Sequence, residues 1–349
     1  MYLGEDYVSA EATLMYQEAG SASAMAAKQL AANEVRVAQL GATLRSRKPR
    51  AVITIARGSS DHAATFARYM IETELGILTS SLAPSIGSVY NASVDLKDTL
   101  CLAVSQSGKS PDLIKAVETA KAGGAFVVAL INAPDSPLEA IADASLPLMA
   151  GPKIPVAATK SFILTLTAVT QLVAAWSDDA ELTRAVKTLP EGLAAAWSQS
   201  WSDAVASLTD AHNLFVVGRG MGFGVAQEAA LKFKETCGLH AEAFSSAEVQ
   251  HGPMALVQKD FPVLAFAQND GTRASVLEVA AKFAERGAKV LLAGGEAAGA
   301  RVLPSVAAHP LVEPILLIQS FYKMAAQLSV ARGFDPDRPP QLSKVTETF

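Results

Sequence analysis

The stretch LCLAVSQSGKS, residues Leu100–Ser110, decides the fold class. Its first five residues form a continuous apolar run, which is typical of a strand buried in a parallel sheet. A turn rich in Ser and Gly follows, and then Pro111 and Asp112 provide the usual opening of a helix. A strand, a Gly/Ser turn and a helix in this order predict a βαβ unit.

The same alternation extends in both directions along the chain. An Ala-rich, helix-forming segment precedes Pro49, and similar apolar runs occur at 51–56 (AVITIA), 126–131 (FVVALI), 213–217 (NLFVV), 262–267 (PVLAFA) and 289–293 (KVLLA). The dipeptide Arg-Gly at 57 recurs at 219, and Gln106 recurs as Gln268, both with an offset of 162 residues. This repeat predicts an α/β protein made of two doubly wound parallel-sheet domains in tandem.

The composition limits the function. The chain has 349 residues, 50% of them hydrophobic and 18% charged, with a formal net charge of -5, so we expect about two compact domains. The negative charge excludes nucleic acid and anionic membranes as main partners, whereas a small anion needs only a local pocket. Cys101 and Cys237 lie in apolar or helix-like stretches without CxxC spacing and are expected to be reduced core thiols. With neither a secretory signal nor an apolar span of ~20 residues in the sequence, we expect a cytoplasmic protein.

Two turns that follow strands are candidates for an anion site. In SQSGKS, three hydroxyls, a glycine and a lysine precede a helix N-terminus, a place where loop amides bind phosphate. The alternative is a serine-rich capping turn. The turn RGSSDH at 57–62 follows the first run and either completes the anion site or holds sugar hydroxyls, although a lone histidine such as His62 is more typical of capping or packing.

Two known nucleotide-binding patterns do not fit the sequence. SQSGKS lacks the earlier glycine of a GxxxxGK[ST] loop, and the turn GRGMGFG at 218–224 has Phe223 where a dinucleotide fingerprint needs glycine. In the second copy, Ala267 and Asn269 replace the hydroxyls of the first copy. We therefore expect the second copy to have lost phosphate binding, and we expect no nucleotide cofactor.

The segment GVAQEAALKFKETCG, residues 224–238, predicts a buried helix with Glu228, Lys232 and Glu235 on one face. Surface salt bridges are the alternative interpretation. A partly desolvated carboxylate beside an ammonium suits proton abstraction next to a carbonyl. His240 and His251 follow closely, but their spacing is not that of metal ligands, so we expect no metal and favour an acid/base role for one histidine.

Eight ordered motifs carry a family resemblance that extends from about residue 15 to the C-terminus: RGSS, SQSGKS, VAATKSF, GRG, ALKFKE, HAEAF, HGPMAL and DRPPQLSKVT. The chain resembles the tandem sugar isomerase (SIS) domain family, in particular the isomerase half of glucosamine-6-phosphate synthase. The resemblance implies two flavodoxin-like α/β/α sandwiches with a phosphosugar site between them. It predicts a helical lead-in over 1–36, a first domain over 37–183, a second over 200–339 and a tail over 340–349 that closes the site.

The resemblance also implies residue roles for binding. It assigns the phosphate to the SQSGKS loop, the sugar to the RGSS turn and the pocket wall to VAATKSF. The corresponding positions in this sequence are Ser105, Gln106, Ser107 and Ser110 for the phosphate, Ser60 near the sugar, and Val156 lining the pocket.

The catalytic roles implied by the resemblance fall on three motifs. Glu235 corresponds to the base that moves a proton between C1 and C2, with Lys232 beside it. His251 corresponds to the ring-opening histidine that a second subunit contributes, which implies a homodimer. In the tail, Lys344 corresponds to the lysine that forms a Schiff base with the open-chain ketose, and Ser343 is its neighbour in the pocket.

The sequence departs from the family pattern in two ways. Met1 is followed by Tyr2, so no N-terminal catalytic cysteine and no glutaminase domain are expected, and Arg57 and Lys109 replace a Cys and a Glu. Without a glutaminase we expect deamination of an amino-sugar 6-phosphate such as glucosamine 6-phosphate. The alternatives are an ammonia-dependent isomerase subunit, a fructosamine-6-phosphate deglycase, and a regulator that binds phosphosugar without turnover.

Overall fold

A computed structural model describes residues 9–152, 156–340 and 342. The chain divides into two compact units. The first-sheet unit contains residues 24–152 and 164–187. The second-sheet unit contains the described residues of 9–23, 156–163 and 188–342.

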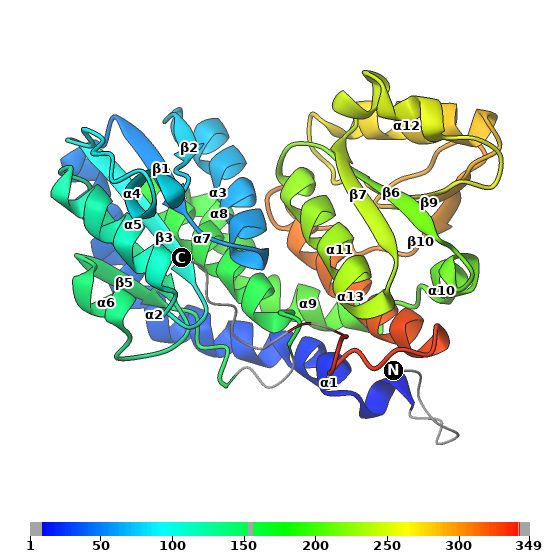
Figure 1. The fold of residues 1–349 in the computed structure, drawn as a ribbon, viewed down its shortest axis with the longest axis horizontal. Helices are drawn as coiled ribbons and strands as arrows, with labels where there is room; N and C mark the ends of the chain where they lie inside the picture. Colours follow the sequence, from blue (N-terminus) through cyan, green and yellow to red (C-terminus); the bar gives the residue numbers. More distant parts are fainter. Residues whose placement is uncertain (1–8, 153–155, 341, 343–349) are drawn as a thin grey trace. The chain divides into compact units, whose positions relative to one another are not determined.

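The first-sheet unit is built on five parallel strands in the order β2-β1-β3-β4-β5, flanked by helices on both faces (Figure 1). This order is that of the flavodoxin-like doubly wound fold, which confirms the predicted class. The strands are β1 (Ala51–Ile55), β2 (Thr79–Ser81), β3 (Thr99–Ser105), β4 (Phe126–Ile131) and β5 (Ala144–Pro147). The helices are α2 (Ala22–Arg47), α3 (Ser59–Leu75), α4 (Ser85–Ser88), α5 (Pro111–Ala122), α6 (Pro137–Ile141), α7 (Lys160–Ser177) and α8 (Ala180–Lys187).

The second-sheet unit repeats this topology, because its strand order β10-β9-β8-β6-β7 is the same order read from the other edge. The strands are β6 (Asn213–Gly218), β7 (His240–Ser245), β8 (Pro262–Phe266), β9 (Lys289–Ala293) and β10 (Arg301–Leu303). The α-helices are α1 (Leu14–Gly20), α9 (Leu189–Ser198), α10 (Ser202–Leu208), α11 (Met221–Cys237), α12 (Arg273–Glu285) and α13 (Glu313–Ala331), and the 3-10 helices are η1 (Ala10–Ala12), η2 (Glu248–Gln250) and η3 (Pro253–Leu256).

The two copies share their backbone detail at the first turn. Gly58 precedes α3 with φ 54° and ψ −131°, and Gly220 precedes α11 with φ 58° and ψ −134°. A positive φ favours glycine, so both copies need the same residue type at this position. The offset of 162 residues found in the sequence therefore joins positions that are equivalent in the fold.

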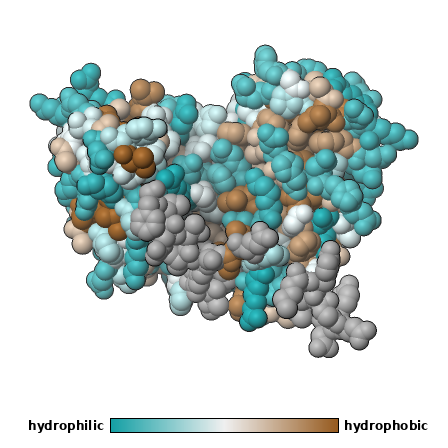
Figure 2. Space-filling model, in the orientation of Figure 1, coloured by the Kyte–Doolittle hydropathy of each residue, from teal (hydrophilic) through white to brown (hydrophobic). Residues whose placement is uncertain are grey.

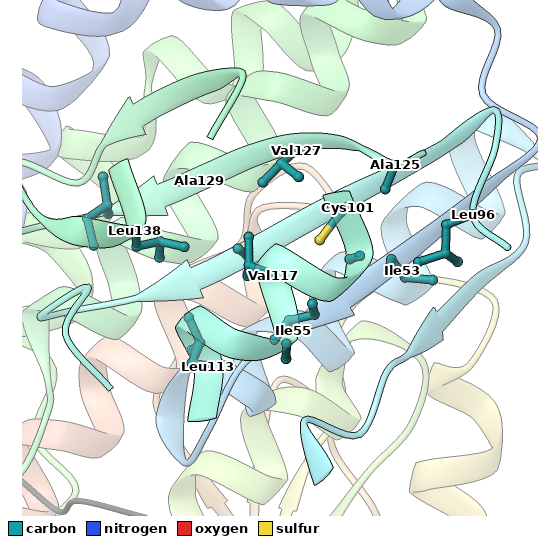
Figure 3. Packing of buried hydrophobic residues seen from close by; sticks show 14 residues of the cluster. Ile53, Ile55, Leu96, Cys101, Leu113, Val117, Ala125, Val127, Ala129 and Leu138 are labelled. Carbon is teal, nitrogen blue, oxygen red and sulfur yellow. The ribbon is translucent and has the colours of Figure 1, made fainter. Parts of the chain in front are cut away.

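The core of the first sheet follows from the pleat of its strands (Figure 3). Residues two apart along a strand point to the same face. On the face covered by α5, the strands contribute Ile53, Ile55, Cys101, Ala103, Val127 and Ala129, and the helix contributes Leu113, Ala116, Val117 and Ala120. All of these residues are buried, and fully burying a large aliphatic side chain is worth about 1.5–3 kcal/mol.

The second sheet has an equivalent cluster under α12 and an aromatic layer on its other face. Phe321 of α13 makes edge contacts with Phe233 of α11 and Phe266 of β8, at ring-centroid distances of 5.1 and 6.3 Å. Trp201 adds a tilted contact with Phe266 at 6.4 Å. These rings hold α11 and α13 against the sheet, so α11 has little freedom to move.

The N-terminal helix α1 belongs to the compact second-sheet unit, and its hydrogen bonds are made with residues of that unit. Gln319 of α13 donates to the carbonyl of Ala19 at 3.0 Å. The carboxylate of Asp337 accepts the N–H groups of Leu14 and Met15 at 2.7 and 2.8 Å. The first turn of α1 is therefore capped by a residue more than 300 positions later.

Both cysteines are buried and free, as predicted. Burial raises the pKa of the thiols of Cys101 and Cys237 to about 12, so neither is a thiolate at neutral pH.

Figure 2 shows small hydrophobic groups among mainly hydrophilic residues on the visible face. None of the helices in the described part of the chain is long and apolar enough to cross a membrane.

The close approach of α2 and α7 in the first-sheet unit gives a test of the packing. A Cβ at Gly41 would lie 2.6 Å from the carbonyl oxygen of Ala175, so Gly41→Val forces two helix backbones apart. We expect it to reduce the free energy of unfolding by about 1–3 kcal/mol in chemical denaturation. Ala42→Val, at the exposed neighbouring position, is the control and should change stability little. Equal stability of the two variants would contradict this packing.

Candidate functional site

The SQSGKS loop continues β3 and is held by its own hydroxyls. Ser105 is buried, and its Oγ accepts the N–H of Gly108 at 3.0 Å. The Oγ of Ser107 accepts the N–H of Lys109 at 3.3 Å. Because an accepting hydroxyl still has its own proton to donate, both serines remain donors for an anion.

A glycine is required in the middle of the loop. Gly108 has φ +63°, and a Cβ there would lie 2.4 Å from Ser136 Oγ and 2.8 Å from Ile131 Cδ1. The loop ends at Ser110, which is the N-cap of α5 but makes no side-chain capping bond. Its hydroxyl therefore remains for a ligand. In the first turn of the helix, Pro111 has no N–H, and the N–H of Leu113 donates to Asp112 Oδ1.

The neighbouring turn brings a second set of donors to the same sheet edge. Strand β1 pairs with β3, so the turns that follow these two strands are adjacent. Ser60 lies in the first turn of α3, where its N–H donates to the carbonyl of Arg57 at 3.1 Å. Gln106 is partly exposed, and its carbonyl accepts the N–H of Ala133 at 3.1 Å. Val156, the expected pocket residue, is assigned to the second-sheet unit.

The equivalent loop of the second sheet is filled by its own carboxylate. Asp270 Oδ1 accepts the N–H of Thr272 at 2.7 Å, and Asp270 Oδ2 accepts from Nε2 of Gln268 at 3.0 Å. Gln268 is fully buried. A carboxylate that takes up the loop donors leaves few for a phosphate and repels a second anion, which gives a physical reason for the expected loss of phosphate binding.

The main polar feature of the second-sheet unit is a buried ion network on α11. The ammonium of Lys232 lies 3.4 Å from the carboxylate of Glu228 and makes a short ion pair with Glu235. The hydroxyl of Tyr322, on α13, donates to Glu228 Oε1 at 2.9 Å. The expected grouping of Lys232 and Glu235 is therefore present, and Tyr322 extends it.

Burial and charge act in opposite directions on this network. Burial disfavours the charged form of Lys232, but the carboxylates of Glu228 and Glu235 outweigh it and raise the pKa of the lysine. Burial, followed by the charge of Glu228, holds the pKa of Tyr322 well above its usual value. Lys232 is thus a fixed cation and Tyr322 a fixed hydrogen-bond donor at neutral pH.

Exposure separates the members of the network by role. The side chains of Lys232 and Glu228 are 1% and 0% exposed, whereas that of Glu235 is 22% exposed. The alternative of surface salt bridges on α11 is therefore wrong. Glu235 is the most exposed of the three side chains, and it lies beside the buried ammonium of Lys232.

The two histidines lie in different structural settings. His240 is the first residue of strand β7, and His251 is an exposed residue that follows η2, where its N–H donates to the carbonyl of Glu248 at 2.9 Å. Within the described residues, no side-chain hydrogen bond joins His251 to Lys232 or Glu235. Ser343 and Lys344, the expected tail residues, lie outside the described residues.

Sequence reasoning missed Tyr322 and Asp270. Tyr322 lies in the apolar helix α13, 94 residues from Glu228, and nothing local marks it as a partner of a carboxylate. Asp270 had a usable signal, because QNDGT places a short acidic residue in the turn where the first copy has serines.

Removing the buried cation Lys232 should lower the free energy of unfolding. Lys232→Met leaves two carboxylates facing each other, one of them fully buried, and should destabilise the protein by about 3–5 kcal/mol. The double variant Glu228→Gln/Lys232→Met should recover most of that loss in chemical denaturation. Lys282→Met, which breaks an exposed pair with Glu278, is the control and should change stability little. Wild-type stability of Lys232→Met would contradict the network.

Comparisons with known proteins match the chain over both sheets. A family model for the SIS domain matches residues 45–175 and 207–330. Isomerizing glutamine-fructose-6-phosphate aminotransferases from Pyrobaculum aerophilum and Aeropyrum pernix are 36% and 34% identical over 84% of this chain. The chain spans about half the length of these relatives, 51% and 50%.

Solved structures give the same assignment. A chain assigned as a phosphosugar isomerase from Silicibacter pomeroyi is 44% identical, with a TM-score of 0.89 over 93% of this chain and 100% of its own. The C-terminal domain of glucosamine-fructose-6-phosphate aminotransferase from Francisella tularensis, 24% identical, shares the fold with a TM-score of 0.85 over 97% of this chain and 100% of its own. The matched family model covers most of both units, and the chain belongs to the SIS-domain family.

Proposed function

We propose that the protein is a phosphosugar isomerase that acts on an amino-sugar 6-phosphate and releases ammonia. The observation that carries the proposal is the Glu228–Lys232–Glu235 network, in which a buried ammonium holds one reachable carboxylate. A buried ion network of this kind is costly to build, and perturbed ionisable groups cluster at functional sites. The names of the aminotransferase relatives, which include fructose 6-phosphate, support the choice of sugar.

The proposed substrate is glucosamine 6-phosphate, bound by its phosphate. Ser105, Gln106, Ser107 and Ser110 provide donors at the N-terminus of α5, and Ser60 contacts the sugar. Such donors favour the charged phosphate without a metal ion. The roles of Ser60 and of Val156 as a pocket residue follow from the family resemblance.

The reaction then needs three proton movements. His251 transfers the proton that opens the ring and leaves an aldehyde at C1. Glu235 takes the proton from C2 and delivers it to C1, while a second proton passes from the amino group on C2 to O1; the aldehyde becomes a CH₂OH group and the amine becomes an imine at C2. Water adds to this imine and expels ammonia, so that glucosamine 6-phosphate and water become fructose 6-phosphate and ammonia.

Lys232 and the tail have supporting roles in this scheme. The ammonium of Lys232 is proposed to keep a positive charge beside Glu235 while the proton moves, and this charge is fixed because Lys232 is buried between carboxylates. Lys344, with Ser343 as its neighbour, is proposed to hold the open-chain ketose as a Schiff base.

The test is turnover of glucosamine 6-phosphate by the purified protein, with ammonia and fructose 6-phosphate measured together. We expect both products in equal amounts and a loss of at least about 100-fold in kcat for Glu235→Gln, because a general base contributes about that much or more. Glu242→Gln, an exposed residue of β7, is the control and should retain activity. Parallel reactions with fructose 6-phosphate plus ammonia, and with fructosamine 6-phosphate, distinguish synthesis and deglycation from deamination. No product from any of these substrates would overturn the proposal.

We also propose that the active protein is a homodimer in which His251 serves the other subunit. His251 is exposed, so a second subunit can contact it, and the family resemblance assigns this position to the neighbouring subunit. Variants His251→Ala and Glu235→Gln should each be inactive alone. Co-expression should restore about a quarter of wild-type activity, since about half of the dimers are mixed and each has one intact site. Co-expressed variants that stay inactive would contradict the exchange of His251.

A further inference from the structure

Arg57 follows β1, the strand that pairs with β3, and it has no role in the scheme above. Strands β1 and β3 are paired in parallel with Ile55 opposite Ala103. Strand β1 ends at Ile55 and Arg57 follows two residues later, while Ser105 is the last residue of β3. Because the two strands are parallel neighbours, Arg57 and the SQSGKS loop follow them at the same edge of the sheet.

One edge of the guanidinium is fixed by a buried carboxylate. Nε and Nη2 of Arg57 donate to Asp112 Oδ2 at 3.0 and 2.7 Å. Asp112 is the second residue of α5, and its Oδ1 accepts the N–H of Leu113 at 2.8 Å. The side chain of Asp112 is 2% exposed, whereas that of Arg57 is 53% exposed. The carboxylate therefore lies behind the guanidinium, whose other edge remains accessible.

As a link between the segment after β1 and α5, the Arg57–Asp112 ion pair contributes little to the free energy of unfolding. Half-exposed pairs contribute about 0–1 kcal/mol to stability. Asp112 is also stabilised by the first turn of its own helix, where a negative charge is favourable. What the pair does achieve is to restrict a long side chain to one orientation beside the loop, which lowers the entropy cost of ligand binding.

The unused edge of Arg57 matches a phosphate. Arginine has five N–H donors in a planar fork, and two parallel N–H groups bind two phosphate oxygens. Two of the five N–H groups contact Asp112, and the other three make no hydrogen bond with the described residues. The charged groups nearby are Asp61 and His62 on α3 and the exposed Lys109 in the loop.

We propose that Arg57, oriented by Asp112, is a ligand of the substrate's phosphate group and selects phosphorylated over unphosphorylated sugars. The inference rests on the proposed function only in taking the SQSGKS loop as the phosphate site. Arg57 adds an oriented positive charge beside a loop whose own cation is the exposed Lys109 and whose other donors are neutral hydroxyls and amides. Asp112 is a positioning residue, because it acts on the phosphate through Arg57.

The experiment measures equilibrium binding of fructose 6-phosphate, inorganic phosphate and fructose by calorimetry. For Arg57→Ala we expect the dissociation constant for fructose 6-phosphate to rise about 10- to 100-fold, the range for losing a charged hydrogen bond, with a similar rise for inorganic phosphate. Arg57→Lys keeps the charge but not the fork and should recover only part of the loss. Asp112→Asn should weaken binding less than Arg57→Ala, and the double variant should be no weaker than Arg57→Ala alone.

The matched control is Arg68→Ala. Arg68 lies on α3, is 55% exposed and pairs with Glu72 at 3.4 Å, so its loss removes the same charge from the same unit. Binding by Arg68→Ala should stay within about twofold of wild type, since distant surface charges are screened by salt. Lys109→Ala removes a positive charge from the loop itself but leaves the guanidinium of Arg57 in place. We expect it to raise the dissociation constant for fructose 6-phosphate less than Arg57→Ala does.

The outcomes separate the two proposals. If the wild-type protein binds fructose 6-phosphate but turns over none of the tested substrates, the deaminase proposal is overturned. The binding constants of the variants then still decide whether Arg57 is a phosphate ligand. Wild-type affinity in a folded Arg57→Ala or Arg57→Lys protein would overturn the role of Arg57, as would equal effects of Arg57→Ala and Arg68→Ala. If Arg57→Ala does not fold, Arg57→Lys decides. Failure of the wild type to bind either phosphate compound would overturn both proposals.

Discussion

A lysine ammonium shut away from water between two carboxylates is the constraint on which the second-sheet unit depends. A charge in that position is tolerated only if its partners are held in place, because desolvation is expensive and must be offset by close opposite charges. Glu228 and Glu235 provide these charges from the same face of α11, and Tyr322 supplies a hydrogen bond from α13. The aromatic layer that fixes α11 against α13 therefore also fixes the position of the reachable carboxylate.

The duplicated fold distributes two kinds of chemistry over two copies of one topology. In both copies, a glycine with almost the same φ and ψ lies between the first strand and the helix that follows it, so the backbone forms equivalent turns there. The copies differ in what fills the next turn. In the first sheet, serines leave donors available, whereas in the second sheet Asp270 occupies them. The backbone of this turn differs as well, because Gly108 has φ 63° whereas Asp270, 162 residues later, does not have a positive φ.

The sequence predicted the central strands and missed the edges for a physical reason. Central strands such as β3 and β4 are buried on both faces, which requires the continuous apolar runs that revealed them. Edge strands such as β2, with sequence TSS, are short and polar and resemble turns. The face of α11 was predicted from its spacing, but its burial depends on α13, and neither Tyr322 nor the contact of Arg57 with Asp112 follows from local sequence.

The capping of α1 by Asp337 has a consequence for how the polypeptide is made. Helix α1 is synthesised before the residues that contact it, Gln319 and Asp337, which follow about 300 residues later. The first-sheet unit lies between them and has all its strands before residue 150, so it can fold while synthesis continues. The second-sheet unit can form these contacts only after Asp337 has been synthesised, and contacts between residues so far apart in the sequence slow folding.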